Sequence, residues 1–163
     1  EAETAEERRE LEALMQERKV PAGRELTWRD EDGWYVLHLA AYFGIKGAVS
    51  LLLRRRADPN VTTNNGSTPV YVAVQNGHVP FIKVLADLGA DINKAMNDGC
   101  TPMHIAAQNG NGQAIKVLAD LGADVDKAMN NGCTPVHMAA QNGHYQSLTL
   151  LAQRGAGVNK ALN

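Results

Sequence analysis

Residues 97–111 carry the side chains best suited to chemistry in this 163-residue chain. The stretch NDGCTPMHIAAQNGN holds a thiol at Cys100, an imidazole at His104, a carboxylate at Asp98 and closely spaced glycines. A thiol beside an imidazole can form a nucleophile–base pair, and both groups can bind zinc. The stretch could therefore be a reactive site, or every one of these residues could serve the architecture.

The same stretch recurs along the chain, and this recurrence favours architecture. NNGCTPVHMAAQNGH begins at Asn130, NNGSTPVYVAVQNGH begins at Asn64, and a weaker copy, EDGWYVLHLAAYFGI, begins at Glu31. The leading glycines, at positions 33, 66, 99 and 132, are all 33 residues apart. Four copies in strict register predict a repeat protein, in which each unit is stabilised by stacking on the next.

Each copy is predicted to form a helix, a turn, a second helix and a hairpin loop. Thr101 can cap the first helix, Pro102 suits its first position, and Gly110 can end it in a left-handed conformation. The second helix, QAIKVLADL, should bury Ala114, Ile115, Val117 and Leu118. Both helices are shorter than the ~12–15 residues at which isolated helices become marginal in water, so stacking must stabilise them.

The repeated pattern resembles that of the ankyrin-repeat family. GSTPVYVAVQNGH…GADIN, GCTPMHIAAQNGN…GADVD and GCTPVHMAAQNGH…GAGVN match the family's G-x-T-P-x-H-x-A-A…G-H…L-L…G-A-D-x-N pattern over about residues 30–163. The resemblance implies an all-α repeat solenoid of helix-turn-helix units joined by hairpin loops. The first repeat departs from the pattern, because Tyr35 and Val36 replace Thr-Pro and Arg56 replaces the helix-ending glycine.

The predicted organisation is an N-terminal capping helix and linker over residues 1–29, followed by an ankyrin-repeat domain over residues 30–163. The repeats are expected at about residues 30–62, 63–95, 96–128 and 129–163. Within residues 4–19, Leu11, Leu14 and Met15 have the spacing of one apolar stripe, which the cap would bury. No cap follows the fourth repeat, so we expect the native chain to continue beyond Asn163 with more repeats or another domain.

The histidines and cysteines are better explained by structure than by chemistry. By resemblance, His38, His104 and His137 each bond to a local threonine hydroxyl and to the backbone of a neighbouring loop. Cys100 and Cys133 lie one period apart, and packed helices sit ~8–10 Å apart, whereas a disulfide needs Cα atoms within ~7 Å. We therefore expect no disulfide, no catalytic residue, no metal and no cofactor.

Composition narrows the class of partner. Residues 1–32 carry eleven acids and six bases, and residues 33–163 carry seven acids and ten bases. Neither balance favours nucleic acid or a membrane surface, and no apolar run approaches the ~20 residues of a membrane span. Two cysteines suit a reducing compartment. These features predict an intracellular protein, cytoplasmic or nuclear, whose partner is another protein rather than nucleic acid, a membrane or a small molecule.

The resemblance places the variable positions of a concave groove around the loop glycine and just before the helix-ending glycine. The partner contacts expected from this rule are Trp34, Tyr42, Phe43, Asn64, Asn65, Ser67, Gln75, Asn76, Asn97, Asp98, Cys100, Gln108, Asn109, Asn130, Asn131, Gln141 and Asn142. The rule also covers Glu31, Asp32 and Cys133. The expected groove is rich in amides except in the first repeat, where it is aromatic.

Five of the eight aromatic residues fall within residues 28–43. Trp and Tyr dominate interface hot spots, so Trp34, Tyr42 and Phe43 could anchor a partner. They could equally pack beneath the N-terminal helix and its linker; we favour partner contact for Trp34 and packing for Trp28 and Tyr35. The predicted function is a protein–protein interaction module. The alternative is a regulatory or substrate-recognition segment of a larger multidomain enzyme or channel.

Overall fold

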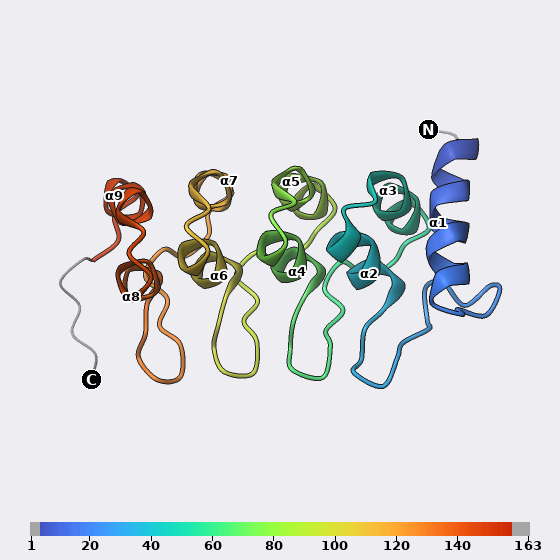
Figure 1. Ribbon diagram of the computed structural model, residues 1–163, viewed down its shortest axis with the longest axis horizontal. Helices are drawn as coiled ribbons and strands as arrows, with labels where there is room; N and C mark the ends of the chain where they lie inside the picture. The colour runs from blue at the N-terminus through green and yellow to red at the C-terminus, as the bar shows by residue number, and fades with distance from the viewer. Residues whose placement is uncertain (1–3, 158–163) are drawn as a thin grey trace. The chain divides into compact units, whose positions relative to one another are not determined.

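The computed structural model describes residues 4–157, and this part of the chain forms nine α-helices and no strand (Figure 1). The predicted all-α repeat solenoid is confirmed. The helices group into two compact units, one ending at Ala90 and one beginning at Asp91. The predicted division between residues 29 and 30 stays a prediction, and residues 158–163 of the fourth repeat lie outside the described part.

The first unit holds the N-terminal helix and two repeats. Its helices are α1 (Ala5–Glu17), α2 (Val36–Phe43), α3 (Lys46–Arg54), α4 (Pro69–Gln75) and α5 (Val79–Asp87). Each repeat is a helix pair, α2 with α3 and α4 with α5, and a long hairpin loop leads into its first helix (Figure 1). The first helices of the two repeats, α2 and α4, pack on each other.

The second unit is built in the same way. Its helices are α6 (Pro102–Gln108), α7 (Gly112–Asp120), α8 (Pro135–Gln141) and α9 (Tyr145–Gln153). α6 packs on α8, and α7 packs on α9, so the unit has an inner and an outer helix layer. The core contains fully buried aliphatic side chains, among them Ile115, Leu118 and Leu151.

The helices begin and end where the sequence predicts. Thr68, Thr101 and Thr134 are N-caps, each followed by a proline in the first turn. Gly110, which follows the C-cap of α6, has φ +67, in the left-handed region that glycine adopts without steric cost. One side chain of the second helix was predicted wrongly: Val117 is only half-buried, because it lies about a quarter-turn from the face made by Ala114, Ile115 and Leu118.

The N-terminal helix α1 packs against α3 and α2, as expected of a helix that caps the stack. Leu11 and Leu14 are buried against these helices, whereas Met15 is half-buried. An ion pair borders this contact: Arg54 Nη2 lies 2.5 Å from Glu7 Oε2, and the Arg54 guanidinium lowers the pKa of Glu7 to about 2. The helix therefore joins the stack by an apolar stripe and by charges at its edge.

Candidate functional site

His104 has no ring nitrogen left for catalysis or metal binding. Its Nδ1 accepts the Thr101 N–H at 3.2 Å and lies 2.8 Å from Thr101 Oγ1, while Nε2 lies 3.2 Å from the carbonyl oxygen of Cys133. The ring is fully buried, and burial lowers its pKa. The predicted link from a threonine to a neighbouring hairpin is therefore present in this repeat.

The histidines equivalent to His104 in the first and last repeats, His38 and His137, differ in their hydrogen bonds. His38 Nδ1 accepts the backbone N–H of Tyr35 at 3.1 Å, and Nε2 lies 2.9 Å from the carbonyl oxygen of Ser67. The prediction that His38 bonds to a threonine hydroxyl was wrong. Residue 35 is tyrosine, and its backbone N–H is the donor to His38 Nδ1. His137 Nδ1 does pair with Thr134 Oγ1, at 2.9 Å. Its bond to a further loop stays a prediction.

Nothing in residues 4–157 brings three histidine, cysteine, aspartate or glutamate side chains together in a way that could hold a metal ion. Cys100 and Cys133 are not joined by a disulfide, and both are buried. Cys100 is 4% exposed and Ser67, its counterpart one repeat earlier, is 6% exposed. Their side chains therefore offer a partner almost no surface, which corrects the sequence expectation that this slot faces outward.

Two of the predicted contact asparagines join neighbouring hairpin tips. In the first unit, Asn64 Nδ2 donates to the carbonyl oxygen of Glu31 at 2.7 Å, and its backbone N–H donates to that of Asp32 at 2.9 Å. In the second unit, Asn130 repeats both bonds to Asn97 and Asp98, at 3.0 and 2.9 Å. These amides hold adjacent loops in register, and the sequence pattern gave no sign of it.

Three more of the predicted contacts shape the hairpins themselves. The Oδ1 atoms of Asn65, Asp98 and Asn131 accept the backbone N–H of the residue two positions later, at 3.1, 2.8 and 3.0 Å. Such bonds tighten a turn by standing in for a backbone bond. Asn76 and Asn142 likewise donate from Nδ2 to carbonyl oxygens one turn earlier in their helices, both at 2.8 Å.

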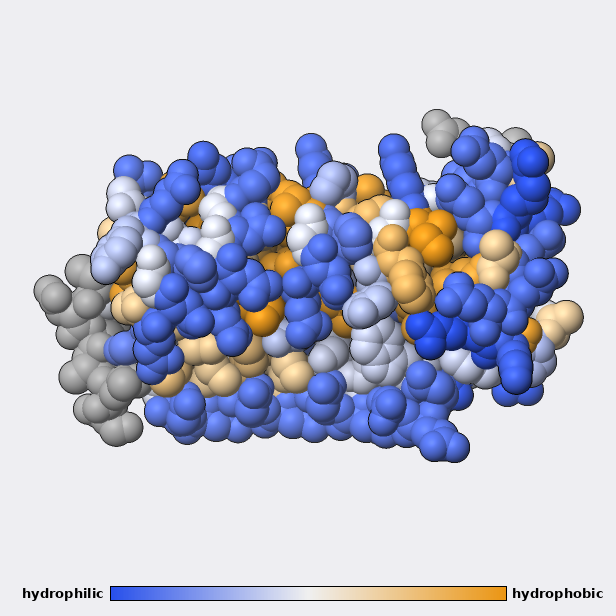
Figure 2. All heavy atoms as spheres, in the orientation of Figure 1, coloured by the Kyte–Doolittle hydropathy of each residue, from blue (hydrophilic) through white to orange (hydrophobic). Residues whose placement is uncertain are grey.

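The remaining amides of the predicted set differ in exposure. Gln75, Asn97, Asn109 and Gln141 are exposed, and Gln108 is half-buried. Figure 2 shows hydrophilic side chains over the hairpin loops that each unit has in Figure 1. These residues present polar surface, but none of them forms a concentrated feature.

The aromatic side chains of the first repeat form a cluster, which we call the aromatic patch and which consists of Trp34, Tyr42 and Phe43. The rings of Trp34 and Tyr42 meet edge to face with centroids 5.8 Å apart, and those of Tyr42 and Phe43 do so at 5.0 Å. Tyr42 is 42% exposed and Phe43 40%, while Trp34 is half-buried. Large apolar rings with this much exposure distinguish the patch from the packed core.

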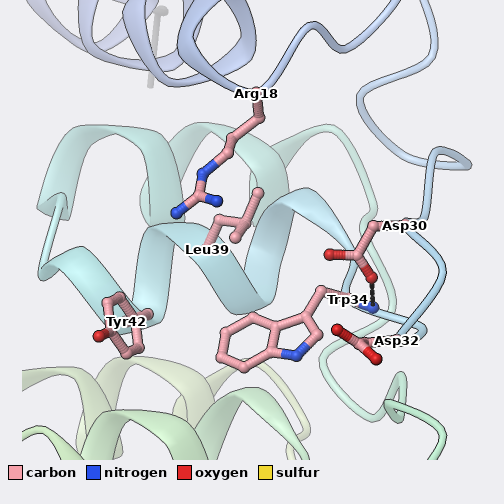
Figure 3. A pocket seen from close by; sticks show the side chains of 6 residues that line it. All are labelled: Arg18, Asp30, Asp32, Trp34, Leu39 and Tyr42. Carbon is pink, nitrogen blue, oxygen red and sulfur yellow. Dashed lines mark hydrogen bonds between the residues drawn. The ribbon is translucent and has the colours of Figure 1, made fainter.

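A pocket of about 320 Å³ lies beside the patch (Figure 3). Its lining residues are Arg18, Asp30, Asp32, Trp34, Leu39 and Tyr42. In Figure 3 the carboxylates of Asp30 and Asp32 flank one end of the Trp34 indole, and Arg18 extends from the end of α1 over Leu39. The same Arg18 guanidinium lies 5.3 Å from the centre of the Phe43 ring.

Arg18 and Asp30 are the pocket residues that sequence reasoning missed. Both lie outside the positions that the repeat rule selects, because Arg18 is the C-cap of the N-terminal helix and Asp30 precedes the hairpin tip. A signal was available for Asp30, since an aspartate four residues before a loop N–H can accept a bond from it; here Trp34 N–H donates to Asp30 Oδ1 at 2.7 Å.

Sequence comparison agrees with this architecture. The family described as ankyrin repeats in three copies matches residues 9–96 and 93–161. The chain belongs to the ankyrin-repeat family. Ankyrin repeats are generally protein–protein interaction modules and are typically non-catalytic.

Several curated proteins contain segments similar to this chain. The chain is 36% identical over 72 residues to calmodulin-binding transcription activator 6 of Arabidopsis thaliana, which is 40% of this chain and 9% of that protein. It is 43% identical over 54 residues to Rabankyrin-5 of Mus musculus, 33% of this chain and 5% of that protein. It is 36% identical over 66 residues to serine/threonine-protein kinase 12 of Arabidopsis thaliana, 40% of this chain and 14% of that protein. The chain thus matches only a small part of each relative's length.

Among the helices described here, none has the length and apolar character needed to cross a bilayer.

Proposed function

We propose that this ankyrin-repeat chain is an interaction module that binds a partner protein through the groove formed by its inner helices and hairpins, with the aromatic patch as the anchor. The observation that supports the proposal is the exposure of Tyr42 and Phe43 beside Trp34. Interface hot spots are enriched in tryptophan and tyrosine, and truncating one such side chain often costs ~2 kcal/mol or more of binding free energy.

The rest of the surface supports a contact role of lower energy. Gln75, Asn97, Asn109 and Gln141 are exposed and polar, which suits the rim of an interface rather than its centre. Asn64, Asn65, Asn130 and Asn131 already hold hairpins in shape, so replacing them would alter the loops as well as any contact. The aromatic patch is therefore the cleanest place to test the proposal.

The proposal includes no reaction, nucleic acid, membrane or small-molecule substrate, and it places the module inside the cell, in the cytoplasm or nucleus. The buried histidines His38 and His104 use both ring nitrogens in structural bonds, so neither imidazole is available as a general base. A typically non-catalytic family is consistent with this view.

The test is affinity capture from a lysate of the source organism with quantitative mass spectrometry. The variant carries Trp34→Ala, Tyr42→Ala and Phe43→Ala, and the matched control carries Tyr145→Ala. Tyr145 is also aromatic and is 79% exposed, but it begins the outer helix α9. We expect proteins captured by the wild type and the control to be lost by the triple variant. Equal capture by a triple variant that retains its circular dichroism spectrum would contradict the proposal.

A second candidate function is a regulatory or substrate-recognition segment of a larger enzyme or channel. The observation that favours it is that the similar proteins are far longer than the aligned segment, and one of them is named a serine/threonine-protein kinase. Sequencing the complete open reading frame tests it directly. A catalytic or membrane domain beside this chain would favour it, and an open reading frame of ankyrin repeats alone would exclude it.

A further inference from the structure

The pocket beside the aromatic patch has an uneven distribution of charge. Asp30 and Asp32 contribute two carboxylates at one end of the Trp34 indole, and Arg18 contributes one guanidinium over the other part of the pocket (Figure 3). The Arg18 charge is already placed against an aromatic ring, 5.3 Å from the centre of Phe43. The end of the pocket bounded by Trp34 and the two aspartates is therefore negative and aromatic.

The carboxylate of Asp32 has a different role from its counterparts in the other repeats. In those repeats the residue just before the loop glycine, Asn65, Asp98 or Asn131, uses its side-chain oxygen to accept the N–H two residues later. In the first repeat that N–H belongs to Trp34 and is donated to Asp30 instead. The exposed Asp32 side chain is thereby relieved of the turn bond, and it lines the pocket.

We propose that this pocket binds a basic side chain, arginine or lysine, of the partner protein. The inference rests on the proposed function and names the chemistry of its anchor. A cation is attracted to the face of a tryptophan or tyrosine ring, and a guanidinium or ammonium group pairs with carboxylates by charge-assisted hydrogen bonds. Trp34 and Tyr42 supply the rings, and Asp30 and Asp32 supply the carboxylates.

Size and longer-range charge support the same occupant. A volume of about 320 Å³ is at the lower end of the range for ligand pockets, which suits one long side chain and its adjoining backbone better than a large ligand. Residues 1–32, which contribute Arg18, Asp30 and Asp32 to the pocket, carry eleven acids against six bases. This excess of negative charge attracts a basic segment at low ionic strength.

The charge of Arg18 should have opposite effects on basic and acidic ligands. A cation that enters the pocket is repelled by the Arg18 guanidinium, whereas an anion would be attracted by it. Replacing Arg18 with glutamine removes the charge and keeps a polar side chain of similar reach. The substitution should tighten binding of a basic ligand and weaken binding of an acidic one.

The experiment is an NMR titration of the tryptophan indole N–H signals with capped tripeptides. The chain has two tryptophans, Trp28 and Trp34, and a Trp28→Phe variant assigns the Trp34 signal. The probes are acetyl-Gly-Arg-Gly-amide and acetyl-Gly-Lys-Gly-amide, with the Gln and Glu tripeptides as neutral and acidic matches. We expect the basic peptides to shift the Trp34 signal with at least fivefold higher affinity than the neutral one, and the effect to weaken in high salt.

Variants of single charges locate the site. Asp32→Asn should weaken binding of the basic peptides at least fivefold, whereas the matched control Glu31→Gln removes a neighbouring exposed charge that does not line the pocket and should change it less than twofold. Arg18→Gln should strengthen it. Equal binding of basic and neutral peptides, preference for the acidic peptide, or equal effects of Asp32→Asn and Glu31→Gln would each overturn the inference.

The two proposals fail in distinguishable ways. If the aromatic patch variants lose a partner but the pocket shows no preference for basic peptides, the patch binds by other chemistry and the inference is wrong. If the pocket prefers basic peptides but the triple alanine variant captures every partner, the pocket has the predicted preference for a basic group, but the captured partners do not use it and the anchor role of the patch is wrong.

Discussion

His38 and His104 occupy one slot of the repeat and connect neighbouring hairpins in the same way. Each accepts a backbone N–H at Nδ1 and reaches a carbonyl oxygen of the next hairpin with Nε2. Both rings are fully buried, and burial lowers the pKa of each. These imidazoles are neutral and hydrogen-bond to neighbouring hairpins instead of acting as bases. Because their burial favours the neutral form, the stability of the fold depends on pH.

Stability should fall as the pH drops below 6.5. Burial lowers the pKa of His38 from 6.5 to about 4, so between these values the unfolded chain holds more protons than the folded one. The stabilisation is complete above the unfolded pKa, and about 2 kcal/mol of it should be lost by pH 5 from this residue alone. Urea unfolding at pH 7 and pH 5 measures the loss, and NMR titration of the His38 ring reads its pKa directly. A His38 midpoint near 6.5 would contradict the account.

Arg56 carries conformational strain that its counterparts avoid. It has φ +66, whereas one period later Gly89 has φ +93. A left-handed conformation costs a non-glycine residue ~1–2 kcal/mol, partly offset by the greater freedom of glycine in the unfolded chain. Arg56→Gly should therefore stabilise the protein by ~0.5–1 kcal/mol in urea unfolding. The converse change, Gly89→Ala, should destabilise the protein by ~1–2 kcal/mol, although the added Cβ would have no atom within 4 Å apart from those of its chain neighbours. Destabilisation by Arg56→Gly or stabilisation by Gly89→Ala would refute the explanation.

Sequence patterns located the residues that start and stop helices better than those that make contacts. Thr101, Pro102 and Gly110 act within one helix, so their types and spacing were sufficient. Gly44 and Gly110 also need to be small for a reason the pattern does not contain. An added Cβ would lie 2.6 Å from ring atoms of His78 and His144, respectively, and those contacts join different repeats.

At the scale of elements, the docking of α1 on α3 depends on a close approach as well as on an apolar stripe. Leu11 and Leu14 are buried, as their spacing predicted, but the position of Gly47 under α1 could not be predicted from periodicity. A Cβ there would lie 2.1 Å from Glu10 Oε2 and 3.0 Å from the Cα of Glu7. The Arg54–Glu7 and Arg55–Glu25 pairs were also not predicted, because each joins residues far apart in the sequence.

Gly47→Ala should destabilise the protein by ~1–3 kcal/mol, even though alanine is the better helix former. The new methyl group must push the backbone of α1 away, so amide hydrogen exchange in α1 should accelerate. Gly112→Ala is the matched control, since its Cβ would meet only the flexible end of Leu150, at 2.9 Å. It should change stability by less than ~1 kcal/mol. Similar losses in both variants would show that the contact with α1 is not the cause.

At the scale of the whole molecule, the sequence predicts the repeat and its period but not which surface is left for a partner. Strict register identified the ankyrin family, and the concentration of aromatic residues in the first repeat pointed to the aromatic patch. The structure removed Ser67 and Cys100 from the contact surface by burial and assigned Asn64 and Asn130 to the joining of loops. These outcomes depend on rotamers and neighbouring loops, which a one-dimensional pattern does not specify.

The most direct test of the proposed function is photo-crosslinking from inside the aromatic patch. A photoreactive phenylalanine replaces Tyr42, and in a matched protein it replaces Tyr145, which is even more exposed but lies on the outer helix α9. After irradiation in source lysate, the account predicts a discrete adduct from position 42, competed away by unlabelled wild-type protein, and none from position 145. Adducts of the same proteins from both positions, or from position 145 alone, would contradict it.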